Sequence, residues 1–147
     1  DVSNEIVIGT TTNTGQKTIG GYSANTLVAY TNNITAAYLT TVMTNYGAAT
    51  QLYAKEGRTY MIVMHGRLYM NDTSSTLEVL LNLRDGTTTL DSTSVLGYYR
   101  QTNHLAFKHF YTATSDTLLN LRIAAQEIST GISANIQDYG ISIYEIG

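Results

Sequence analysis

The chain has 147 residues, of which 43% are hydrophobic and 13% charged, and it carries a formal net charge of −3 and no cysteine. This length suits one domain, residues 1–147, large enough to bury a core, and the lack of cysteine excludes disulfides and thiolate metal sites. The 8 Lys and Arg residues are scattered, which argues against nucleic-acid binding, and no apolar run approaches the roughly 20 residues of a membrane-spanning helix.

The N-terminal third predicts one strand and one ambiguous segment. Residues 4–9, which include Ile6 and Ile8, form a short apolar run that predicts a strand. Residues 35–46 fit either a short helix ending at Gly47 or a strand, because helical spacing competes with several threonines. The residues at helical spacing are Leu39, Val42, Met43 and Tyr46.

Four longer segments show period-two alternation and predict two β-hairpins. Residues 59–70 and 76–84 are expected to pair around the turn-forming sequence NDTSS, with Gly66 marking a bulge and Asp85-Gly86 ending the second strand as a turn. Residues 104–111 and 117–125 are expected to pair in the same way. The sequence LLNLR occurs in the second strand of each hairpin and predicts equivalent buried positions, namely Leu81 and Leu83 in one strand and Leu119 and Leu121 in the other.

The C-terminal residues predict two more strands, 131–137 and 140–147, on either side of a corner at Asp138-Tyr139-Gly140. In the last strand, Ile141 and Ile143 alternate onto one face, which we expect to meet the core. Tyr144 and Ile146 lie on the opposite face. That second apolar face predicts a partner, because an uncovered apolar patch at a chain end favours aggregation.

Together these seven to nine short strands, without proline or βαβ alternation, predict an all-β fold. We expect an antiparallel β-sandwich of the jelly-roll type, with the short helix near residues 35–46 as one open alternative. A single domain accommodates all of these elements.

No constellation of side chains indicates catalysis, a metal site or a cofactor, so the sequence does not predict an enzyme. His104 and His109 are five residues apart and face opposite sides of a strand, and His65 stands alone. The carboxylates are dispersed, and nothing distinguishes a pair such as Glu78 and Asp91. Tyrosine is enriched, with 12 residues.

Three features of the second half resemble a known family: the segment GRLYMNDTSSTLEVLLNLRDG, the strand LLNLRIAA, and a last strand with the pattern aromatic-Gly-x-x-x-aromatic. They are similar to the compact trimeric jelly rolls of the tumour-necrosis-factor and complement-C1q type. Head fibres, decoration proteins and fibre tips of tailed bacteriophages share this pattern. The resemblance covers roughly residues 58–147, and the threonine-rich, cysteine-free composition is closer to the phage proteins.

The resemblance implies a homotrimer at a virion surface, with the major capsid protein or another virion protein as a second partner. In that family the last strand lies beside the first near the three-fold axis. This implies an oligomer interface formed by Tyr144 and Ile146 together with Ile6 and Ile8 of the strand 4–9.

The leading hypothesis is therefore a non-enzymatic virion structural protein that decorates a phage capsid or forms a head fibre. The alternative is a receptor-binding or carbohydrate-binding fibre tip that attaches to a host surface glycan. Exposed tyrosines can stack on sugar rings, and Tyr98 and Tyr99 are the candidate ligand-binding residues for this alternative.

Overall fold

The computed structural model describes residues 17–19, 22–24, 26–70, 77–97, 102–128 and 134–147, and within these ranges every regular element is a strand. No helix in this described part is long and apolar enough to cross a membrane. The strands are β1 (Lys17–Ile19), β2 (Tyr22–Ala24), β3 (Thr26–Tyr30), β4 (Ala37–Tyr38), β5 (Thr44–Ala54), β6 (Thr59–Met70), β7 (Leu77–Asp85), β8 (Thr88–Gly97), β9 (Thr102–Thr112), β10 (Thr117–Glu127) and β11 (Ala134–Glu145).

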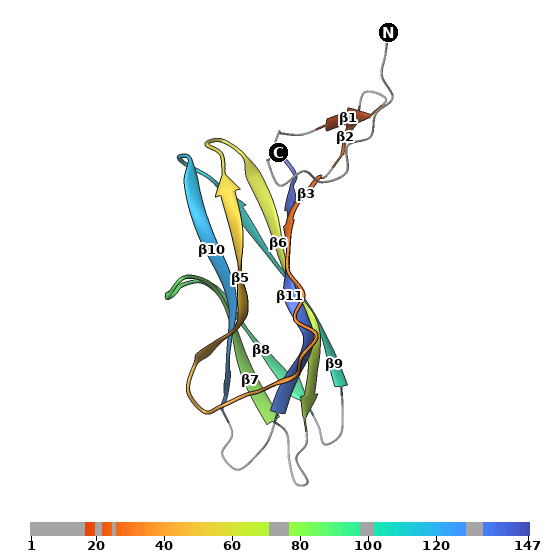
Figure 1. The fold of residues 1–147 in the computed structure, drawn as a ribbon, viewed down its shortest axis with the longest axis vertical. Coiled ribbons are helices and arrows are strands. Elements are labelled where there is room, and N and C mark those ends of the chain that lie inside the picture. Colours follow the sequence, from red (N-terminus) through yellow and green to blue (C-terminus); the bar gives the residue numbers. More distant parts are fainter. Residues whose placement is uncertain (1–16, 20–21, 25, 71–76, 98–101, 129–133) are drawn as a thin grey trace.

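Two antiparallel sheets face each other as a β-sandwich (Figure 1). One sheet has the order β5-β10-β7-β8 and the other β3-β11-β6-β9, with β4 also paired to β11, while β1 and β2 pair with each other. From β5 onward the chain changes sheet at every connection except that between β7 and β8. These crossings give jelly-roll connectivity, so the predicted fold class is confirmed.

Both predicted hairpins are wrong. β6 pairs with β11 and β9, whereas β7 pairs with β10 and β8 in the other sheet. β9 and β10 are separated in the same way. Turn-forming residues mark where a strand ends, but in a jelly roll the chain then crosses the sandwich instead of folding back beside itself.

The helical interpretation of residues 35–46 is also wrong. This segment contains the short strand β4 and the start of β5. Leu39 is buried, but Val42 is 68% exposed, so the residues at helical spacing do not form one apolar face. The threonines of the segment fit the extended conformation.

The two expected C-terminal strands form the single strand β11, which carries a bulge where a corner was predicted. Its pairing with β6 shifts register between Gln137 and Gly140, opposite Gly66. Gly66 is required there because an added Cβ atom would lie 2.8 Å from the Cβ atom of Tyr139. The bulge predicted at Gly66 is therefore present, with its extra residue on β11.

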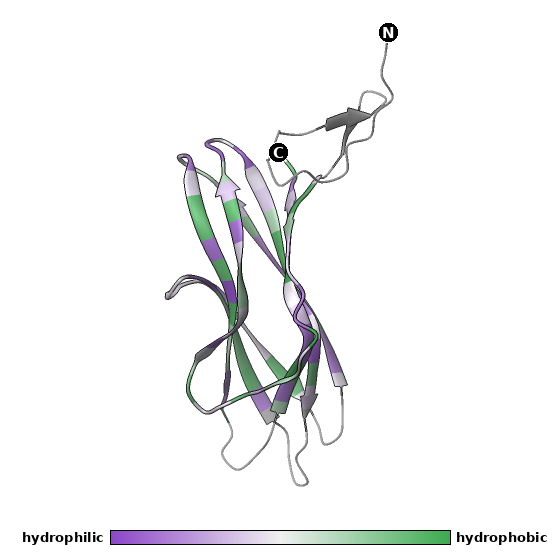
Figure 2. Cartoon of the chain, viewed as in Figure 1, coloured by the Kyte–Doolittle hydropathy of each residue, from purple (hydrophilic) through white to green (hydrophobic). Residues whose placement is uncertain are grey.

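The core lies between the two sheets, and Figure 2 shows hydrophobic and hydrophilic residues alternating along the strands that enclose it. Every one of the four leucines predicted from the LLNLR segments is buried, which confirms their inward register. Ile141 and Ile143 are buried as predicted. The largest fully buried side chains are Tyr60, Leu52, Ile62, Met64, Leu68, Leu81, Leu83, Leu121, Ile136 and Ile141.

Candidate interaction surface

An apolar row crosses the outer face of the β3-β11-β6-β9 sheet. Tyr144 on β11 is the register partner of Leu27 on β3 and of Met61 on β6, and Met61 is the register partner of Phe110 on β9. Directly paired residues of antiparallel strands project from the same face. Leu27, Tyr144, Met61 and Phe110 therefore form one continuous row across four strands, which we call the apolar row.

The apolar row points away from the core. Its neighbours along the strands, Ile143 on β11 and Ile62 on β6, are fully buried on the inner face. Within the chain, Phe110 remains 60% exposed and Leu27 41% exposed, while Tyr144 and Met61 are half-buried. No charged side chain belongs to the row.

The next row toward the middle of the sheet is mixed in character. It contains Tyr30, Ser142, Val63 and Lys108, paired in that order across β3, β11, β6 and β9. Tyr30 stacks on His65 with the ring centroids 5.8 Å apart and the ring planes 10° apart. The outer face therefore carries an uncharged apolar row near the C-terminal end of β11, and polar and charged side chains begin in the next row.

The C-terminal end of β11 is held by backbone and side-chain contacts. The Ile146 N–H donates to the Thr59 carbonyl at 2.9 Å, and the Thr59 N–H donates to the Gly147 carbonyl at 2.7 Å. Arg58 Nη1 lies 3.4 Å from Oε1 of the buried Glu145. These contacts orient Tyr144 and Ile146 on the outer side of the sheet.

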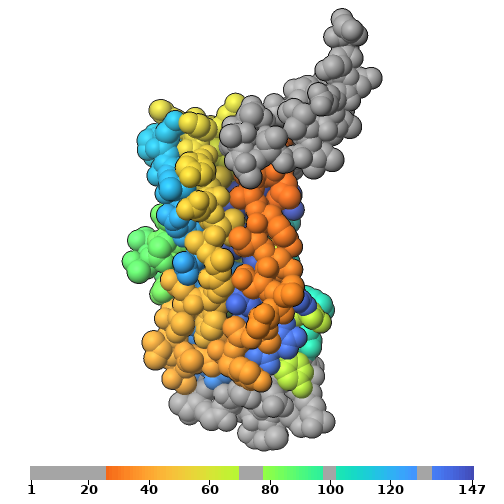
Figure 3. Space-filling model, in the orientation of Figure 1, coloured from red at the N-terminus to blue at the C-terminus, as the bar shows by residue number. Residues whose placement is uncertain are grey.

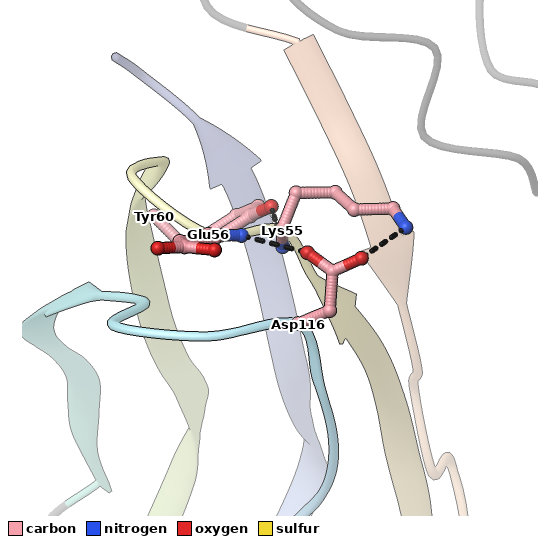
Figure 4. Close-up of polar contacts among 4 residues, drawn as sticks. All are labelled: Lys55, Glu56, Tyr60 and Asp116. Atoms are coloured by element: carbon pink, nitrogen blue, oxygen red, sulfur yellow. Dashed lines mark hydrogen bonds and ion pairs between the residues drawn. The ribbon is translucent and has the colours of Figure 1, made fainter.

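A polar network closes the neighbouring turns at this end of the sandwich (Figure 4). The Lys55 ammonium and the Glu56 N–H donate to the two oxygens of Asp116, at 2.8 and 2.9 Å, and the Lys55 N–H donates to the Tyr60 hydroxyl. The hydrogen bond from Lys55 lowers the pKa of the Asp116 carboxyl and raises the pKa of the Lys55 ammonium. The network joins the turn after β5 to the turn before β10.

The predicted interface residues are only partly within the described ranges. Tyr144 and Ile146 are half-buried on the outer side, while Ile6 and Ile8 lie outside the described residues. Between Ser142 and Glu145, β3 and β6 occupy both edges of β11. A strand has only two hydrogen-bonding edges.

The histidines do not form a shared site. His104 is exposed and His109 points between the sheets, as their spacing predicts. His109 Nδ1 lies 2.8 Å from Asp91 Oδ2 and so links β9 to β8 of the other sheet. The hydrogen bond with His109 lowers the pKa of Asp91.

Among the described residues, no three His, Asp or Glu side chains lie close enough to hold a metal ion. Tyr98 and Tyr99 lie outside the described residues. The sequence did not predict Leu27, Met61 and Phe110 as partners of Tyr144. Alternation along residues 104–111 separates Phe110 from Phe107 and His109, but the register that joins Phe110 to Tyr144 is not a local signal.

No family model matches the chain, and no curated protein matches it significantly. Among solved structures, the chain is similar to Eiger TNF from S. frugiperda, with 12% identity over 76% of this chain and 92% of that one and a TM-score of 0.40. It is also similar to the CBM22-1 xylan-binding domain from Paenibacillus barcinonensis Xyn10C, with 10% identity over 82% of this chain and 88% of that one and a TM-score of 0.34. At this level of identity neither structure indicates a function for this chain.

Proposed function

We propose that the protein is a non-enzymatic structural subunit that assembles as a homotrimer through the outer face of the β3-β11-β6-β9 sheet. The observation that supports the proposal is the apolar row of Leu27, Tyr144, Met61 and Phe110. The row is continuous, uncharged and partly exposed. The trimeric state itself comes from the resemblance to tumour-necrosis-factor and C1q-type jelly rolls.

Covering the row with another copy of the chain removes apolar surface from water. Fully burying one large apolar side chain contributes about 1.5–3 kcal/mol, and a cyclic assembly repeats the gain in every subunit. The exposed fractions of Phe110 and Leu27 show that much of this gain is still available to a partner. The hydrogen-bonded strands fix the row before association, which limits the entropy lost on binding.

The proposal predicts that Phe110→Asp disrupts the oligomer. The change places a charge in the apolar row, while the 60% exposure of Phe110 lets the single subunit tolerate it. We expect the wild-type chain to run as a trimer in light-scattering chromatography and the variant as a monomer with an unchanged far-ultraviolet circular dichroism spectrum.

Leu96→Asp is the matched control for this experiment. Leu96 is 62% exposed on β8, in the other sheet, so the same charge there should leave the trimer intact. If both variants remain trimers, the apolar row is not part of the interface. If both variants lose the trimer, an added negative charge disrupts the oligomer on either sheet, and the effect does not identify the interface.

We further propose that the trimer belongs to a virion surface, in contact with the major capsid protein or another virion protein. This part of the proposal is supported by the phage-like composition. Mass spectrometry of purified virions from the source of the gene should detect the chain in fixed stoichiometry with the capsid protein. Its absence from purified particles would contradict the proposed location.

A further inference from the structure

A groove runs along the side of the sandwich where the edge strands β3 and β5 face each other. Its volume is about 350 Å³, within the range of about 300–1,000 Å³ that is typical of small-molecule sites. Figure 3 shows these two strands, both in orange to yellow, adjoining on the near side of the molecule. The residues that give the groove its chemistry are Tyr30 and Thr31 beside β11, and Thr50, Gln51 and Tyr53 on β5.

We propose that this groove binds a neutral saccharide. A sugar ring presents apolar C–H faces and many hydroxyl groups, so its receptor needs aromatic surface beside uncharged hydrogen-bonding groups. The lining offers both, because Tyr30 is 55% and Tyr53 59% exposed, and it also includes the hydroxyl of Thr31 and the side-chain amide of Gln51. Its lining contains no Asp, Glu, Lys, Arg or His side chain, so it does not favour an ionic ligand.

The groove is organised before any ligand arrives. The hydroxyls of Thr31, which follows β3, and of Thr50 on β5 lie 2.6 Å apart and link the two sides of the groove. Stacking on His65 restricts the Tyr30 ring. Gln51 donates from Nε2 to Asn120 at 3.2 Å, which leaves its side-chain oxygen as an acceptor. Fixed groups of this kind reduce the entropy lost when a ligand binds.

This site differs from the one that the sequence suggested at Tyr98 and Tyr99. The β5 side of the groove lies outside the proposed trimer interface, because Tyr53 and Gln51 belong to the opposite sheet, whereas Tyr30 lies on the same sheet as the apolar row. Replacing Tyr53 or Gln51 leaves the apolar row unchanged. Tyr53 is therefore the most informative residue for a test of the groove.

The test begins with an array of neutral and sialylated oligosaccharides probed with the wild-type protein, followed by calorimetric titration with the neutral oligosaccharide that binds best. We expect saturable binding that Tyr30→Ala and Tyr53→Ala each weaken about tenfold or more, as for other aromatic anchors. The matched control is Tyr38→Ala, since Tyr38 is 72% exposed on β4 and does not line the groove. It should bind like the wild type.

Three results would overturn the proposal. The first is that no neutral oligosaccharide binds above the level of a Tyr30→Ala/Tyr53→Ala double variant. The second is binding confined to sialylated glycans. The third is binding that Tyr53→Ala leaves intact or that Tyr38→Ala weakens equally. Each variant is checked for the wild-type melting temperature, so that unfolding is not mistaken for loss of the site.

Discussion

Single leucines of the inner faces carry much of the stability of the sandwich. Leu81 on β7 and Leu121 on β10 are almost fully buried on neighbouring strands of one sheet. Their positions could be predicted because period-two alternation assigns each residue of a strand to a face without knowledge of the strand's neighbours. The same reasoning correctly separated Ile141 and Ile143 from Tyr144 and Ile146.

We predict that Leu83→Ala or Leu121→Ala lowers the free energy of unfolding by about 2–5 kcal/mol, because each leaves a cavity at a fully buried position. Urea denaturation measures this loss. Leu118→Ala, next to the buried Leu119 but itself 42% exposed, should cost less than about 1 kcal/mol. Equal losses at Leu118 and Leu121 would contradict the register of β10.

Glu127, a buried carboxyl at the end of β10, makes stability depend on pH. Burial raises its pKa from the ordinary value of 4.5, and the hydrogen bond that it accepts from the Ala134 N–H acts in the opposite direction. A raised pKa means that the folded state favours the protonated acid. The contribution to stability is thus complete below pH 4.5 and is lost as the pH rises through the folded-state pKa.

Glu127→Gln tests this dependence, because the amide cannot ionise yet keeps an oxygen for the Ala134 N–H. Urea denaturation should show the variant to be more stable than the wild type at pH 7.5. The difference should shrink as the pH falls toward 4. A variant that is destabilised at pH 7.5 and approaches the wild type as the pH falls toward 4 would show instead that the carboxylate is needed in its charged form.

At the scale of elements, local alternation located the strands but not their partners. Turn sequences such as NDTSS suggested that β6 pairs with β7, whereas each pairs within a different sheet. Strand pairing in a jelly roll joins segments far apart in the chain, such as β6 and β11, and no local signal encodes that register. For the same reason, the apolar row could be predicted at Tyr144 but not at Leu27 or Met61.

Gly140 shows how close packing between elements fixes a residue type. An added Cβ atom would lie 1.9 Å from the Thr31 carbonyl oxygen, where the chain leaving β3 passes over β11. We predict that Gly140→Ala lowers the free energy of unfolding by at least about 1–3 kcal/mol, since the clash is with backbone atoms. Gly147→Ala, whose nearest contact would be at 3.9 Å, is the control and should be nearly neutral in urea denaturation. A stable Gly140→Ala variant would mean that β3 and β11 separate more easily than this packing implies.

At the scale of the whole molecule, the sandwich has a filled core, but the outer face of its β3-β11-β6-β9 sheet is incompletely covered. The two sheets enclose the buried residues, yet the apolar row on β3, β11, β6 and β9 leaves Phe110 and Leu27 partly in water. The turns and the C-terminus at that end are tied together by hydrogen bonds and ion pairs. A rigid apolar surface of this kind favours binding of another protein surface over a conformational change within the chain.

In the proposed assembly another copy of the chain covers this surface, and the mass of the wild-type protein in solution tests this most directly. Light-scattering chromatography at micromolar concentration should give three times the chain mass of 16.1 kDa. The measured mass should stay constant across the eluted peak, although the protein is diluted as it passes through the column. A single species with the mass of one chain, and with Tyr144 and Phe110 open to solvent in solution, would contradict the account.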